Sequence, residues 1–150
     1  MIDIINAARY FVYLSYGKNK YSLTPLKLQK LLYLSQGWSY VWDEKPLFEA
    51  EFCAWKWGPV NEDIYNLFCK YGREEIPKHE GLLLLEEGDV HELSEAKSTI
   101  EAVWEMYCKY NAFALVEITH SQKPWQEAYP DGGTITNESI KKYFQSTYSY

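Results

Sequence analysis

Residues 24–42 have the sequence TPLKLQKLLYLSQGWSYVW, and this stretch decides the fold of the chain. Thr24 followed by Pro25 is typical of a helix start, because the Thr side chain caps a free amide and Pro lacks the amide that would be unpaired there. Apolar side chains then recur at helical spacing to the end of the stretch. They occupy more than one side of the helix, which predicts a central helix that contacts several neighbours. Lys27 and Lys30 are expected to face solvent.

Further helices are predicted on both sides of this one, from the same apolar spacing and from capping residues. Pro59 is expected to open one that runs to Tyr71, and Ser94 to cap another that runs to Tyr107. The remaining predicted helices cover about residues 3–16, 112–121 and 137–145, with a short one that begins at Pro124.

Two short strands are predicted from their composition and from the turns beside them. Residues 51–57, EFCAWKW, alternate in period two and are rich in aromatic side chains, which favours a strand. The run Leu82 to Leu85, closed by a polar turn at residues 86–89, predicts a second one. With the helices, this gives a mainly α (α+β) fold class: a compact multi-helix domain with a small antiparallel β-sheet.

Length and composition favour a single domain over residues 1–150. The chain has 150 residues, of which 47% are hydrophobic and 24% charged, enough apolar material for one core. No stretch has the roughly 20 apolar residues that span a bilayer, and no secretory signal is evident at the start. The three cysteines are widely spaced, which argues against a disulfide framework. We therefore expect a cytoplasmic protein without a membrane partner.

The charge of the chain bears on its partners. Fifteen Lys and Arg stand against 21 Asp and Glu, so that the net charge is −6. Binding to nucleic acid normally needs a basic face that neutralises phosphates, and no direct contact with nucleic acid is expected here. An acidic surface suits a basic protein partner, because it steers the approach of that partner.

Residues that would carry catalysis or hold a metal or cofactor do not form a known pattern. The three histidines are far apart, and there is no glycine-rich phosphate loop, so neither enzymatic activity nor a cofactor is expected. His120 is the residue with two open interpretations. It either hydrogen-bonds backbone or Trp125 and fixes the turn that follows, or it acts as an acid–base group, in which case one of the cysteines is the candidate nucleophile.

Aromatic residues are the unusual feature of the composition. Six Trp, 14 Tyr and six Phe make up 17% of the chain, more than a domain of this size buries completely. Tyr and Trp are enriched at protein interfaces, where a rigid ring covers apolar area. As the surface that binds a partner we predict Trp55, Lys56 and Trp57 with neighbouring Tyr residues. The alternative is that these rings belong to the core or simply tolerate solvent.

Three segments in this order resemble the Panacea domain, a family also described as SocA-like or phage-associated GepA-like. They are TPLKLQKLLYLSQGW (24–38), PLFEAEFCAWKWGPVNEDIY (46–65) and ALVEITHSQKPW (114–125). The resemblance covers about residues 5–145. The family blocks correspond to Lys27, Leu28, Lys30, Leu31, Tyr33, Ala54, Trp55, Trp57, Gly58, Pro59, Val60, Thr119, His120 and Trp125. We expect most of these residues to hold the fold.

The resemblance implies a function in binding another protein. Family members are antitoxins and phage or prophage proteins that neutralise unrelated small toxins by direct contact. One branch delivers its toxin to an ATP-dependent protease as an adaptor. For this chain the resemblance implies an antitoxin that binds a cognate toxin. The alternatives are a proteolytic adaptor and a phage effector that binds a host protein.

Overall fold

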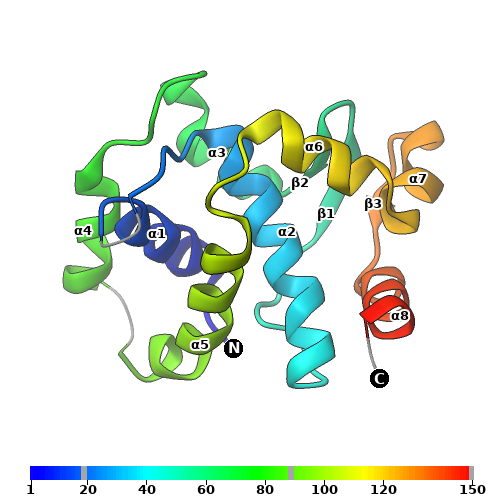
Figure 1. Ribbon diagram of the computed structural model, residues 1–150, viewed down its shortest axis with the longest axis horizontal. Coiled ribbons are helices and arrows are strands. Elements are labelled where there is room, and N and C mark those ends of the chain that lie inside the picture. The colour runs from blue at the N-terminus through cyan, green and yellow to red at the C-terminus, as the bar shows by residue number, and fades with distance from the viewer. Residues whose placement is uncertain (18–19, 88–89, 149–150) are drawn as a thin grey trace.

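The helix α2 (Pro25–Trp42) crosses the middle of the molecule and contacts most of the other elements (Figure 1). The computed structural model describes residues 1–17, 20–87 and 90–148. Thr24 caps the helix by accepting a hydrogen bond from the amide of Lys27, and Pro25 is its first residue. Leu28, Leu31 and their apolar neighbours are buried on several sides of the helix. The predicted central helix is therefore confirmed.

Three helices lie on one side of α2 (Figure 1), namely α1 (Ile4–Ser15), α4 (Lys78–Glu87) and α5 (Val90–Tyr107), and α4 packs on α1. Helices α1 and α4 approach closely, since a Cβ added to Gly81 would lie 2.7 Å from the backbone nitrogen of Tyr13. The strand predicted at residues 82–85 is wrong, because this leucine run belongs to α4. Helix α5 begins at Val90, so Ser94 lies inside it and does not cap it. Of the predicted turn at 86–89, residues 88 and 89 lie outside the described part of the chain.

The other side of α2 carries α7 (Lys123–Ala128), a 3-10 turn η2 (Tyr129–Asp131) and α8 (Asn137–Tyr148), while α6 (Ala112–His120) crosses near the start of α2 (Figure 1). Helix α8 lies close to α2 because Gly37 leaves room for an aromatic ring. A Cβ on Gly37 would lie 2.4 Å from ring atoms of the fully buried Phe144. This contact fixes α8 against the central helix.

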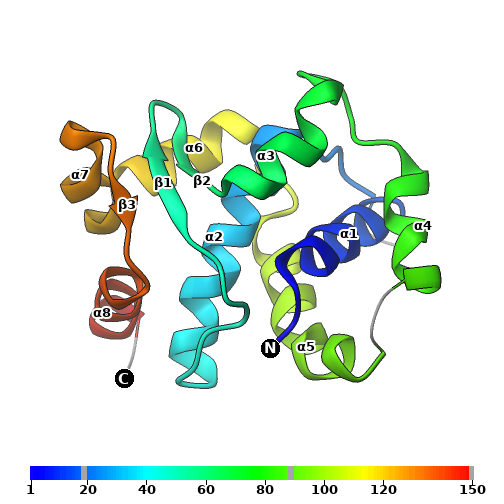
Figure 2. The same cartoon turned by 180° about the vertical axis from the view of Figure 1, so that it is seen from behind.

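The described residues form one small antiparallel sheet, as predicted, but it has three strands, and of the two predicted strands only the one at residues 51–57 belongs to it. The strands are β1 (Phe52–Trp55), β2 (Gly58–Val60) and β3 (Thr134–Ile135), in the order β2-β1-β3. Figure 2 shows them on the face that is turned away in Figure 1. Pro59 lies in β2 and does not open a helix. The helix α3 (Glu62–Phe68) starts after it, capped by Asn61, and continues as the 3-10 turn η1 (Cys69–Tyr71).

The core extends from one end of the described chain to the other. Its buried apolar cluster runs from Ile2 to Phe144 and takes side chains from α1, α2, α5 and α8 as well as from the sheet. Only some of the tyrosines join it. Tyr10, Tyr33 and Tyr40 are buried, whereas Tyr13, Tyr65 and Tyr110 are among the exposed ones. The aromatic excess is thus divided between the core and the surface.

Candidate functional site

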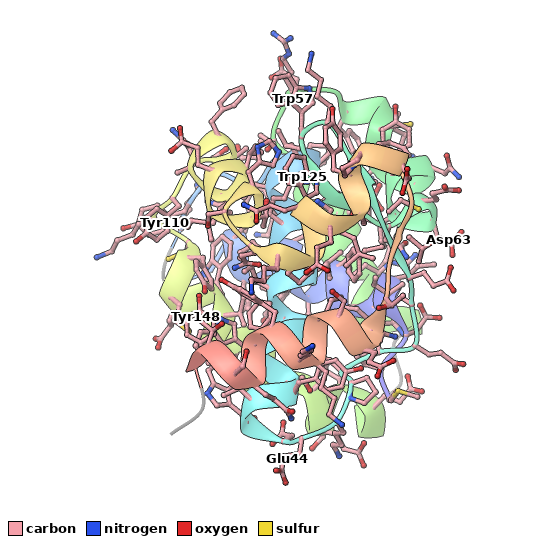
Figure 3. All side chains as sticks on the ribbon, turned by 90° about the vertical axis from the view of Figure 1, so that its right-hand side faces the viewer. Glu44, Trp57, Asp63, Tyr110, Trp125 and Tyr148 are labelled. Carbon is pink, nitrogen blue, oxygen red and sulfur yellow. The ribbon has the colours of Figure 1, made fainter. Side chains whose placement is uncertain are left out.

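The turn between β1 and β2 presents two tryptophans at the surface. Trp55 pairs with Gly58 in the ladder, which leaves Lys56 and Trp57 as the residues of the turn. The exposed fraction of the side chain is 51% for Trp57 and 36% for Trp55, and Trp57 projects from one end of the molecule in Figure 3. The Lys56 ammonium lies 5.0 Å from the ring centroid of Trp57, a distance at which cation and ring attract each other. The predicted surface residues are therefore neighbours on one projecting turn, which we call the aromatic turn (Trp55, Lys56 and Trp57).

Three side chains from three different helices hold this turn by its main-chain oxygens. The Lys30 ammonium of α2 donates to the carbonyl of Pro59 at 2.9 Å. The indole Nε1 of Trp125 in α7 donates to the carbonyl of Trp55 at 2.8 Å. The Nε2 of His120 in α6 donates to the carbonyl of Lys56 at 2.9 Å. Because each bond ends on a main-chain atom, the three bonds hold the hairpin without using the side chains of the turn.

Lys30 is completely buried beneath the turn, so its predicted exposure to solvent is wrong. Its burial lowers the pKa of the ammonium to about 7, since the charged form loses its hydration. Gly58 lies directly above it with φ +105°, a backbone conformation that a side chain disfavours. A Cβ there would lie 2.6 Å from Lys30 Cε and 2.9 Å from Thr119 Oγ1. Gly58 thus allows the turn to approach both side chains closely.

His120 is held by an aromatic stack as well as by its hydrogen bond. Its ring lies 3.9 Å from that of Trp125, centroid to centroid, and Trp125 stacks in turn on Tyr129 at 4.5 Å. Because the acceptor is a carbonyl, the Nε2 of His120 must carry the proton. In the described part of the chain no carboxylate hydrogen-bonds the ring. The ring thus bonds backbone, as one of the two interpretations predicted, but the acceptor lies in the turn between β1 and β2 and not in the turn that follows His120.

A second set of bonds holds the chain just after the turn, and the sequence analysis did not identify it. Gln29 of α2 exchanges two hydrogen bonds with the main chain of Asn61, at 2.9 and 3.0 Å. The side chain of Asn61 caps α3 at the amide of Ile64 and donates to the carbonyl of Glu51. The signal in the sequence is Asn followed by two acidic residues, a pattern typical of a helix start.

Beside the aromatic turn lies a groove of about 370 Å³ with largely apolar walls. Trp55 contacts Tyr65 of α3 edge to face, with ring centroids 5.0 Å apart, and the two rings form part of the wall. The lining of the groove comes from α2, the hairpin, α3 and the segment that follows α3: Pro25, Leu26, Gln29, Trp55, Lys56, Trp57, Val60, Ile64, Tyr65, Cys69 and Gly72. An apolar groove next to exposed tryptophans is suited to receive an apolar side chain of another protein.

The remaining family-block residues lie away from the turn, in the core or beside it. Leu28 and Leu31 are fully buried. The buried hydroxyl of Tyr33 donates to Gln122 Oε1 at 2.8 Å and so connects α2 to the start of α7. Lys27 was also predicted to face solvent, which is wrong, since its side chain is 4% exposed. Its ammonium donates to the carbonyls of Ser22 and Cys108.

Metal ligands do not come together in the part of the chain that the structure describes. There, no three His, Cys, Asp or Glu side chains lie close enough to share a metal ion. The thiol of Cys53 has its pKa raised by burial and by the nearby Glu62, which disfavours the thiolate. Among the described helices, none is both long and apolar enough to cross a membrane.

Comparison with known proteins places the chain in a family. The family model described as "Antitoxin SocA-like, Panacea domain" matches residues 28–126, which include the aromatic turn and all three side chains that hold it. The chain is also 32% identical to the Antitoxin SocA of Caulobacter vibrioides (strain NA1000 / CB15N), over 75% of this chain and 63% of that protein. It therefore spans less than two thirds of the length of that relative. No solved structure matches the chain. From the extent of the family match, the chain belongs to the SocA-like antitoxin family with a Panacea domain.

Proposed function

We propose that this chain is an antitoxin that neutralises a cognate toxin by direct binding, and that the aromatic turn and the groove beside it form the contact surface. Family membership and the relative named Antitoxin SocA support the antitoxin role. The observation that carries the choice of surface is the anchoring of the exposed turn by Lys30, His120 and Trp125.

Anchoring matters because it removes a cost of binding. A loop that must be ordered on contact loses conformational entropy, whereas a turn fixed beforehand does not. Tryptophan is among the residues that contribute most to interfaces, because its large ring excludes water and its N–H keeps a polar partner. Trp57 is exposed and lies on a turn whose main chain is already held. It is therefore the residue that we expect to contribute most to toxin binding.

Charge near the groove favours a basic toxin. Glu62 and Asp63 are exposed at the start of α3, next in sequence to the groove residue Ile64. Together with the net charge of −6, they would attract a cationic partner and increase its rate of association. A toxin that presents an apolar side chain within a basic surface fits both features. Its active or membrane-seeking surface is then covered in the complex.

The test is co-expression with the product of the adjacent gene, scoring growth and co-purification together. Wild type is expected to relieve toxicity and to form a stable complex. The Trp57→Ala variant should neither relieve toxicity nor co-purify with the toxin, while its melting temperature stays that of wild type. Trp42→Ala is the matched control, because Trp42 is exposed to a similar degree but lies at the other end of α2. It should behave as wild type.

Each other outcome of this experiment has a definite meaning. If Trp57→Ala neutralises and binds as well as wild type, the aromatic turn is not the contact surface. A neighbouring product that is harmless on its own contradicts the antitoxin role at this locus. If the chain relieves toxicity without forming a complex, and the lifetime of the toxin is shortened, the chain acts by delivering the toxin to an ATP-dependent protease and not by masking it.

A further inference from the structure

A second hollow, of about 440 Å³, lies where α5 passes to α6. Like the groove, it takes part of its wall from the first turn of α2, here through Thr24 and Lys27. The other walls come from the segment around Tyr21 and from residues 108–113. None of these wall residues belongs to the aromatic turn. The hollow is therefore a separate feature of the surface.

Lys27 gives the hollow a positive charge, and among the described residues no Asp or Glu hydrogen-bonds its ammonium. Its ammonium donates to the carbonyls of Ser22 at 3.0 Å and Cys108 at 2.7 Å, and lies 5.4 Å from the ring centroid of Trp104. All three partners are neutral. An ammonium has three donors, so two of them are used by the carbonyls and, among the described residues, one N–H has no hydrogen-bond acceptor. Burial lowers the pKa of Lys27, as expected for a cation without a counter-ion.

The surroundings of Lys27 add to the positive potential. Lys109 lines the hollow and is exposed, and no Asp or Glu is among the described residues that line it. Helix α6 begins here, with Asn111 as its cap, and its first amides carry the positive end of the helix dipole. A positive hollow is unusual on a chain whose net charge is −6.

Exposed aromatic rings surround this charge. The side chain of Phe113 is 67% exposed, and Tyr21 and Tyr110 are exposed as well. All three line the hollow, and Figure 3 shows Tyr110 projecting from the surface. Exposed rings around a buried cation suit a ligand that carries an anion on an apolar group.

We propose that this hollow binds the C-terminal carboxylate of a polypeptide that ends in an apolar or aromatic residue. The carboxylate accepts the free N–H of Lys27 and compensates its charge, while the attached side chain contacts Phe113 and the tyrosines. A charge-assisted bond of this kind is about twice as strong as a neutral one. A carboxylate is favoured over a phosphate because Lys27 supplies one buried positive charge and the acidic chain repels polyanions.

The proposal can be tested without any toxin, so it stands or falls separately from the proposed function. The probe is N-acetylphenylalanine, titrated into the ¹⁵N-labelled chain and followed by NMR. Chemical-shift changes are expected at the amides of Lys27, Ala112 and Phe113. The uncharged N-acetylphenylalanine amide should bind about tenfold more weakly.

Charge reversal at the rim provides the variant. Lys109→Glu should weaken binding of N-acetylphenylalanine at least about threefold, because Lys109 lies in the wall and is exposed. Lys97→Glu makes the same charge change on an exposed residue of α5 outside the hollow and should leave binding unchanged. Equal affinity for acid and amide, shift changes at the aromatic turn in place of the hollow, or tighter binding of phenyl phosphate would each overturn the proposal.

Discussion

Lys30 lies so close beneath Gly58 that a Cβ on the glycine would stand 2.6 Å from the Lys30 Cε. The ammonium of the same lysine donates to the next residue, Pro59. Helix α2 therefore contacts the hairpin through the methylene chain of Lys30 and hydrogen-bonds it through the ammonium of the same residue. The absence of a side chain at position 58 is what makes both contacts possible.

Replacing Gly58 by Ala should destabilise the fold. The added methyl group meets Lys30 and Thr119, both buried, and the φ of +105° is unfavourable for any residue with a Cβ. We expect the free energy of unfolding to fall by at least about 2 kcal/mol, measured by urea denaturation.

Gly132→Ala is the control for backbone strain alone. Gly132 has φ +60°, and a Cβ there would meet nothing within 4 Å. Its free energy of unfolding should fall by only about 1 kcal/mol. If the free energy of unfolding falls equally in the two variants, the close packing of Gly58 over Lys30 does not contribute to stability.

The buried Lys30 makes stability depend on pH. In the folded chain its pKa is lowered to about 7, whereas in the unfolded chain it is about 10.4. Between these values the unfolded state holds the proton and the folded state does not. Stability therefore rises with pH across this window, by up to about 1.4 kcal/mol per pH unit from this residue.

The Lys30→Met variant should lose this dependence of stability on pH, because methionine fills the space of the lysine side chain without a titratable group. The measurement is the free energy of unfolding between pH 7 and 9.5, in wild type and variant. Lys27, whose pKa is also lowered, is present in both proteins and cancels in the comparison. Identical slopes would mean that Lys30 binds the same number of protons in the folded and unfolded states.

Trp125→Phe tests whether the indole bond fixes the turn. The variant loses the donor to the Trp55 carbonyl, while a ring remains to stack on His120 and Tyr129. Global stability should fall by about 1 kcal/mol or less. Backbone order parameters of residues 55–58 should fall from the rigid value of about 0.85.

A matched variant is Trp38→Phe, which loses the indole bond to the Tyr107 hydroxyl, away from the turn. Its order parameters at 55–58 should equal those of wild type. Should both variants leave the turn rigid, the bonds from Lys30 and His120 suffice to hold it.

Gly81→Ala should separate α4 from α1. Ala is favoured over Gly in a helix by about 1 kcal/mol, but its Cβ would lie 2.7 Å from the nitrogen and 2.9 Å from the Cα of Tyr13. Backbone atoms cannot move aside as a flexible side chain does, so we expect a net loss of about 1–3 kcal/mol in urea denaturation. Gly133→Ala, where the nearest atom is 3.9 Å away, is the control and should be nearly neutral. A stabilised Gly81→Ala protein would show that the two helices are not held at this distance.

The parts of the fold that were predictable are those set by neighbours in sequence. Thr24 and Pro25 indicated the start of α2 because a cap and its helix are adjacent. The burial of Lys27 and Lys30 was missed because their acceptors, Cys108 and Pro59, are 81 and 29 positions away. No local pattern contains such partners.

Two of the other errors have physical causes of the same kind. The leucine run at 82–85 suits a helix and a strand equally, and packing of α4 on α1 decides between them. Pro59 was expected to open a helix, but it lies in a strand whose neighbour β1 precedes it. Of the site, the sequence indicated the aromatic residues and His120. It did not indicate Gln29 and Asn61, whose bonds to each other depend on the tertiary fold. The single domain over 1–150 and the role of the aromatic turn stay predictions.

All three side chains that anchor the hairpin end on the carbonyl groups of Trp55, Lys56 and Pro59. Every amino acid has a carbonyl, so the anchoring does not depend on which residues occupy the tip. We therefore expect substitutions at positions 55–57 to change the proposed contact surface at little cost to the scaffold. If this surface binds the toxin, a lineage could acquire a new specificity during evolution by changing these few codons, and the same three positions are the natural place to randomise when the chain is engineered against a chosen protein.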